Sequence, residues 1–304
     1  MLIQAGCVKR IVASGGGDLI VPAGRSYLVR RIYAEPSGSD TFLTLRVDRK
    51  TVGVYRIGGK SGNHLSFLTE GNIKRNLMEF LEGQGINISI PVAEGQTFNV
   101  SRYAETGEVV IVFDKYSSGD IRADMVNGSD AKEYIFMQYM NNSATKAVSG
   151  DLLMDESESP AEFPDFPCSA VVPARHKIDI LGLAGHPTCH KTTGENYILS
   201  TFVKMIKDRE TLFDEDRAGI IFRAKKPSED KTMYRIDFSL IGACVMSHYS
   251  QADEISADPY MFTPALHFEP GEELLVYVTF ELEGTDTLAA DTVDLAAIMK
   301  VTVS

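Results

Sequence analysis

The residues best suited to hold a metal ion are His186, Cys189 and His190, which fall within one short segment of the chain. Imidazole and thiolate are ligands that Zn²⁺ prefers, but a structural zinc site needs about four of them. No second pair of such residues lies nearby in the sequence. We therefore favour a polar surface loop over a metal centre here, and we expect no bound cofactor.

Two acidic segments have the composition of a calcium site but not its spacing. Residues 214–216 are Asp-Glu-Asp, yet the D-x-D-x-D-G order is missing and Arg217 adds a neutralising charge. Asp155, Glu156 and Glu158 form the second segment. Both segments are expected to be solvated loops, because clustered charges without ligand spacing usually face water.

The sequence has none of the common catalytic patterns. The glycine-rich stretch 14–18 lacks a phosphate-binding pattern, and no G-x-S-x-G motif is present. His64, His176, His248 and His267 stand apart, whereas a metal enzyme built from two cupin barrels needs histidines clustered at fixed spacing. We expect a protein without enzymatic activity, with the two-cupin enzyme as an alternative.

An Asp-Arg pair recurs within a longer repeat. Residues 41–52 align without a gap to residues 201–212, with Thr, Phe, Asp, Arg and Thr identical in register. One interpretation of Asp48-Arg49 and Asp208-Arg209 is a ligand site used twice. The favoured interpretation is a hairpin turn in which Asp bonds its own backbone and Arg pairs across the strands.

Two further matches flank this one, in the same order in both halves of the chain. They are residues 21–23 with 172–174, and residues 91–100 with 267–276. The offset between the copies grows along the chain, so the second copy contains insertions. Repetition of one unit predicts a tandem scaffold, with units at residues 1–130 and 131–304.

Most predicted elements are strands, because short alternating or β-branched runs are separated by turn residues. They cover residues 27–33, 42–49, 51–57, 86–90, 96–103 and 109–113 in the first half, and 134–139, 176–183, 197–207, 233–246, 265–268, 273–282 and 293–303 in the second. One helix is expected over 72–82, capped by Asn72 and ended by Gly83 and Gly85. The predicted fold class is all-β, with two tandem antiparallel β-sandwich or jelly-roll units and one short helix in the first.

The composition excludes several classes of function. The 304 residues carry a net charge of −12 at pH 7, whereas a nucleic-acid surface needs a basic face. Cys7, Cys168, Cys189 and Cys244 lack disulfide or metal spacing, which indicates ordinary thiols and synthesis in a cytoplasm. No apolar run is long enough to span a membrane.

A tandem pair of jelly-roll-sized units in an acidic chain, repeated between residues 21–113 and 172–303, resembles the double jelly-roll major capsid proteins of tailless icosahedral viruses. The resemblance implies a homotrimer whose six barrels mimic a hexagon and tile a shell. It also implies contacts with other virion proteins, and a place in the virion after synthesis in the host cytoplasm.

Two other functions stay open from the sequence. One is a head-decoration or tail-associated virion protein. The other is a two-sandwich module that binds a glycan or another ligand, although the chain has no tryptophan for an aromatic platform. For assembly, the candidates for buried inter-domain or inter-subunit surface are Met137, Tyr139, Met140, Phe163 and Phe166.

Overall fold

The structure is a computed structural model whose contacts divide the chain into two compact units, Met1–Met137 with Lys300–Ser304, and Gln138–Met299. The sequence repeat predicts this boundary between residues 130 and 131. The described residues are 1–14, 17–35, 41–58, 64–65, 76–102, 106–120, 132–148, 150–186, 198–207, 210–214, 243–245, 254–256, 259–282, 287, 289–291 and 294–304.

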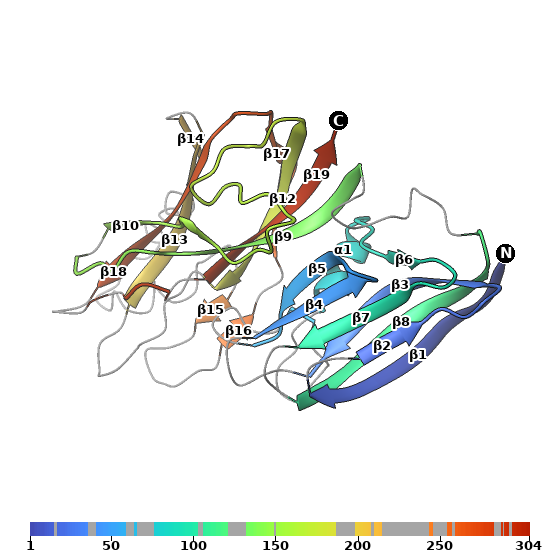
Figure 1. Ribbon diagram of the computed structural model, residues 1–304. Coiled ribbons are helices and arrows are strands. Elements are labelled where there is room, and N and C mark those ends of the chain that lie inside the picture. The colour runs from blue at the N-terminus through green and yellow to red at the C-terminus, as the bar shows by residue number, and fades with distance from the viewer. Residues whose placement is uncertain are drawn as a thin grey trace. The chain divides into compact units, whose positions relative to one another are not determined.

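The first sandwich has eight strands and one helix, α1 (Leu77–Gly83), which follows the fifth strand and precedes the sixth along the chain. The strands are β1 (Leu2–Ser14), β2 (Gly17–Ile20), β3 (Arg25–Ala34), β4 (Phe42–Val47), β5 (Lys50–Arg56), β6 (Ile90–Val92), β7 (Thr97–Arg102) and β8 (Thr106–Ser117). One sheet has the order β1-β8-β3-β6 and the other β2-β7-β4-β5 (Figure 1).

The second sandwich uses eight main strands and a few short additions. The main strands are β9 (Glu133–Asn141), β10 (Gly150–Leu153), β12 (His176–His186), β13 (Ile198–Lys207), β14 (Glu210–Asp214), β17 (Tyr260–Phe268), β18 (Leu274–Leu282) and β19 (Asp294–Val303). One sheet has the order β9-β19-β12-β17, extended beyond β9 by β11 (Glu156–Ser157), and the other β10-β18-β13-β14. The strands β15 (Ala243–Val245) and β16 (Glu254–Ser256) pair with each other.

Both sandwiches have the same topology when their main strands are counted from first to eighth. In each, one sheet reads first, eighth, third, sixth, and the other reads second, seventh, fourth, fifth. This order, with four antiparallel strands in each of two facing sheets, is that of a jelly roll. The predicted all-β fold class is therefore confirmed.

The first sandwich is tied together by a turn between β2 and β3. The Val21 amide donates to the carbonyl of Gln96 at 3.0 Å, and the Val21 carbonyl accepts from the amide of Gly95 at 3.1 Å. Gly95 adopts φ 78, a conformation that glycine reaches without a Cβ clash. The Gln96 side chain closes the same turn by accepting from the amide of Ala93 at 2.8 Å.

The second sandwich repeats these bonds at the positions that the sequence aligns. The Val172 amide donates to the carbonyl of Glu272 at 3.0 Å, and the Val172 carbonyl accepts from the amide of Gly271 at 2.9 Å. Gly271 adopts φ 85. The Glu272 carboxylate accepts from the amide of Glu269 at 2.7 Å, as Gln96 does from Ala93. The repeat thus encodes a tertiary contact as well as strands.

The hairpin in the central repeat is also duplicated, including an irregularity that the sequence did not reveal. The register of β4 with β5 leaves Val52 as an extra residue, and that of β13 with β14 leaves Leu212. These two residues align in the repeat. A β-bulge at the same place in both copies increases the local twist of each hairpin in the same way.

Asp48 forms the hairpin turn as predicted, but its side chain does not bond its own backbone. Its carboxylate accepts from the amide of Thr97 at 2.9 Å and from the side-chain amide of Gln96 at 3.1 Å. The turn therefore anchors to the start of β7, because φ 54 at Asp48 directs the carboxylate toward the neighbouring strand. Asp208 and Arg209 lie outside the described residues.

Each sandwich has an apolar core between its sheets. Full burial of one large apolar side chain stabilises a fold by roughly 1.5–3 kcal/mol. Fully buried side chains include Leu28, Ile32, Leu43, Leu45 and Phe98 in the first sandwich, and Tyr139, Phe166, Leu183, Phe268 and Val278 in the second. Met137, Tyr139, Met140, Phe163 and Phe166 are all buried within the single chain, as predicted for buried residues. They offer no surface to another subunit, so the inter-subunit alternative is wrong for them, and the inter-domain alternative stays a prediction.

The helix begins later than the sequence predicted. Asn76, not Asn72, is its N-cap, and its side-chain oxygen accepts from the amide of Met78 at 2.9 Å. The Asn76 amide group also donates to the carbonyl of Ile32 in β3 at 2.8 Å. β6 pairs with β3 only over residues 27–29, so on that side of β3 the later carbonyls have no strand partner. Asn76 supplies a donor to one of these carbonyls, which explains why it is the cap.

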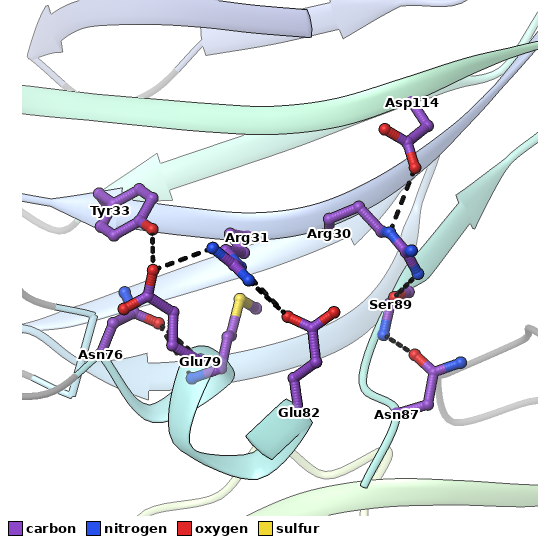
Figure 2. Close-up of polar contacts among 10 residues, drawn as sticks. Arg30, Arg31, Tyr33, Asn76, Glu79, Glu82, Asn87, Ser89 and Asp114 are labelled. Atoms are coloured by element: carbon purple, nitrogen blue, oxygen red, sulfur yellow. Dashed lines mark hydrogen bonds and ion pairs between the residues drawn. The ribbon is translucent and has the colours of Figure 1, made fainter. Parts of the chain in front are cut away.

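Ion pairs hold α1 against β3 in addition to the cap. The Arg31 guanidinium donates to Glu82 at 2.8 Å and to Glu79 at 3.1 Å, and the Tyr33 hydroxyl donates to Glu79 (Figure 2). The hydrogen bond with Glu82 first, and then the contact with Tyr33, raise the pKa of Arg31. Two successive outward residues of β3 thus contact two carboxylates one turn apart on α1.

The strand predicted over residues 86–90 is wrong for most of its length. The Asn87 side chain accepts from the amide of Ser89 at 2.9 Å, a local turn that competes with ladder hydrogen bonds. Strand β6 therefore begins at Ile90, although Ile88 is buried as the alternation required.

We expect Asn76→Ala to lower the melting temperature by about 5–10 °C, because it removes a helix cap and leaves the buried Ile32 carbonyl without this donor. Asn87→Ala, which loses one local bond at an exposed side chain, is the matched control and should change it by less than about 2 °C. Differential scanning calorimetry measures both. Equal shifts for the two variants would contradict this role of Asn76.

Candidate functional site

The structure leaves the predicted metal candidates largely untested. His186 is the last residue of β12, while Cys189 and His190 lie outside the described residues. Among the residues that the structure describes, no three His, Cys, Asp or Glu side chains are grouped as a metal site. The polar surface loop at this segment stays a prediction.

The acidic candidates Asp155 and Glu158 have hydrogen-bond partners within the chain. The Asp155 carboxylate accepts from the amide and hydroxyl of Ser143 at 2.9 and 2.6 Å, and Glu158 accepts from Asn141 at 3.2 Å. The glycine-rich stretch joins β1 to β2 instead of leading into a helix. It therefore lacks the helix N-terminus on which phosphate loops depend. Asp214 ends β14, and residues 215–217 lie outside the described part.

His267, which stands apart in the sequence, has two carboxylate partners in the structure. Its Nδ1 lies 2.6 Å from Asp179, directly opposite on β12, and its Nε2 lies 3.1 Å from Glu269. Lys177 donates to the same Glu269 carboxylate at 2.7 Å. Lys207 donates to the His267 carbonyl at 3.2 Å. Sequence spacing could not find this group, because it depends on the pairing of two strands far apart in the chain.

The electrostatics of this group favour a positively charged imidazole. The pKa of His267 is raised, first by the bond with Asp179 and then by that with Glu269. The pKa of Glu269 is lowered, first by Lys177 and then by His267. Both ring nitrogens are engaged by carboxylates and the side chain is half exposed. This arrangement links two strands and holds a charge on a side chain that is half exposed.

The most prominent surface feature of the described residues is the strand β1. Its exposed apolar residues include Val8 and Val12, with 64% and 67% of their surface accessible. The register with β8 puts Val8 opposite Val112 and Arg10 opposite Val110, so all four share the outer face of the sheet. We name Val8, Val12, Val110 and Val112 the valine face.

The valine face is bordered by α1 on one side and by the sheet edge on the other. Val112 and Val110 are opposite Arg31 and Tyr33 of β3, the two residues that contact the helix. On the other side, β1 is the last of the described strands of its sheet (Figure 1). Within the described part of the chain, the face is therefore bordered by the helix at β3 and by a sheet edge at β1.

The irregular start of β1 is anchored by a buried carboxylate. The pairing of β1 with β8 shifts register around Gly6, whose amide donates to Asp114 at 2.8 Å. Asp114 also accepts from Arg30 at 3.2 Å, and Arg30 reaches Ser89 at 3.4 Å (Figure 2). These contacts tie the start of β1 to β8 and β3.

Comparison with known proteins adds little to this geometry. No protein family matches the chain, nor does any curated protein sequence. Among solved structures, the chain is similar to PNGase F, a glycosylasparaginase from Flavobacterium meningosepticum, at a TM-score of 0.28 and 9% identity, over 98% of this chain and 96% of that one. At that TM-score the similarity carries no conclusion. No described helix is long and apolar enough to cross a membrane.

We expect His267→Gln to destabilise the protein at about pH 5.5 and to have little effect at about pH 9. The pKa of His267 is higher in the folded protein than in the unfolded chain, where it is about 6.5. Protonated His267 therefore stabilises the fold fully at a pH below about 6.5, and this stabilisation is lost as the pH rises through the pKa of the folded protein. Because the group is exposed, the shift in melting temperature should stay within about 3 °C. His176→Gln, whose ring contacts the carbonyl of Ala174, is the control. If the melting temperatures of wild type and His267→Gln differ by the same amount at both pH values, the assignment of a charged imidazole to His267 is contradicted.

Proposed function

We propose that the protein is a virion structural protein, most directly a double jelly-roll capsid subunit that trimerises and tiles an icosahedral shell. The observation that supports this proposal is the duplication itself. The two sandwiches share one strand order, the same bulge, and the same bonds between a valine turn and a glycine turn. A chain with two equivalent frames suits a lattice in which six similar barrels surround each position.

The chemistry of the described residues is consistent with assembly rather than catalysis. The thiol of Cys168 is buried, which raises its pKa to about 12 and keeps it protonated and unreactive. Both nitrogens of His267 are held by carboxylates. The net charge of −12 keeps such a protein dispersed until it meets its partners.

Jelly rolls also suit this role mechanically. The cores of both sandwiches are built from buried side chains of facing sheets, so the frame does not depend on the loops. The second copy carries insertions relative to the first, including the segment with β15 and β16 between β14 and β17. In a shell, such insertions supply contacts with neighbours or with other virion proteins.

We expect purified protein at high concentration to have about three times the chain mass of 33.4 kDa by size-exclusion chromatography with light scattering. A monomer at every concentration and at low salt would contradict the proposal. Saturable binding of a glycan by that monomer would instead support a two-sandwich binding module.

A further inference from the structure

We propose that the outer edge of β1 receives an extended, acidic segment from a second copy of the chain, which continues the sheet beside the valine face. This inference rests on the proposed function and identifies the surface through which copies associate. β1 runs over Leu2–Ser14 and pairs with β8 along one side only, among the residues that the structure describes.

The second sandwich shows how such an edge is filled. The strand equivalent to β1 is β9, the first strand of its jelly roll. On the outer edge of β9 lies β11, with Glu156 opposite Asn141 and Ser157 opposite Met140. In the described part of the first sandwich, the equivalent place beside β1 is empty. The duplicated fold therefore accepts a strand there, which the second sandwich supplies internally and the described part of the first does not.

Charge indicates the nature of the missing strand. The segment that fills the place in the second sandwich contains Asp155, Glu156 and Glu158. β1 carries the cations Lys9 and Arg10 and no acidic residue, in a chain with net charge −12. Arg10 pairs with Glu108 on β8, while Lys9 makes no ion pair within the described residues. An acidic segment of a second copy is complementary to the charge of Lys9 at this edge.

β1 lacks one feature that protects other edge strands, a proline. β17, at the edge of its own sheet, contains Pro264, which cannot donate to an added strand. β1 has no proline in its 13 residues. Its outward positions Val8 and Val12 are exposed apolar groups, and a strand added alongside would cover them by cross-strand contacts. An edge of this kind can accept an extended segment of another chain through backbone hydrogen bonds.

The test compares a variant of the valine face with a matched variant elsewhere. Val8→Glu with Val12→Glu adds negative charge and removes apolar surface at exposed positions, so the fold is retained. Val148→Glu, at a residue with 75% of its surface accessible, is the control. Lys9→Glu is a second variant that alters only charge. Sedimentation velocity gives the oligomeric state, and hydrogen exchange reports on the amides of residues 7–13.

We expect the Val8/Val12 variant to be monomeric where wild type and Val148→Glu are oligomeric, with unchanged melting temperature. The β1 amides should exchange at least about tenfold faster in this variant than in assembled wild type. Lys9→Glu should raise the concentration needed for assembly by about three- to tenfold. If wild type assembles and the Val8/Val12 variant assembles equally well, this inference fails while the proposed function stands. If wild type never assembles, the proposed function fails. Protection of β1 that is independent of concentration would mean that the same chain covers the edge, which also overturns the inference.

Discussion

The pair of backbone hydrogen bonds between a valine turn and a glycine turn is the constraint on which each sandwich depends. In the first copy Val21 bonds Gly95 and Gln96, and in the second Val172 bonds Gly271 and Glu272. These bonds join the connection between the second and third strands to the connection between the sixth and seventh. Both connections cross from one sheet to the other, so the bonds fix how the sheets face each other. The apolar core can then pack in one arrangement.

The features that give the first sandwich its surface follow from that frame. The strand β6 is short, so some carbonyls of β3 have no partner in β6. Asn76 donates a hydrogen bond to one of these carbonyls and also caps α1. Arg31 and Tyr33 then complete the attachment of the helix on one side of the valine face. On the other side β1 is left as an edge, held in place by Asp114. One side of the sheet is therefore finished within the chain, and among the described strands the other side ends at β1.

The sequence predicted the fold class because a repeat is visible without knowledge of distant contacts. Residues 41–52 and 201–212 match since both form the same bulged hairpin. The failures involve choices between a local and a distant partner. The sequence does not identify Asn76 as the cap, because the second hydrogen bond of Asn76 is with β3, which is distant in the chain. The strand predicted over residues 86–90 does not form over most of its length, because the Asn87 side chain accepts from the Ser89 amide.

Surface chemistry was less accessible to sequence reasoning for the same reason. The neighbour of His267 is Asp179, which only the pairing of β12 with β17 brings close. The valine face depends likewise on the register of β1 with β8. Periodicity shows that residues alternate along one strand, but it does not show which strand ends a sheet. An open edge is a property of topology, and it became visible only when the strand order was known.

The central claim is that two equivalent jelly rolls serve as one repeating building block of a shell. Electron microscopy of the purified, concentrated protein tests it most directly. The account predicts trimers with a near-hexagonal outline, in which six barrels of similar size surround the threefold axis, and sheets or shells built from them. Particles that contain a single chain, with no threefold or near-sixfold outline at any concentration, would contradict it.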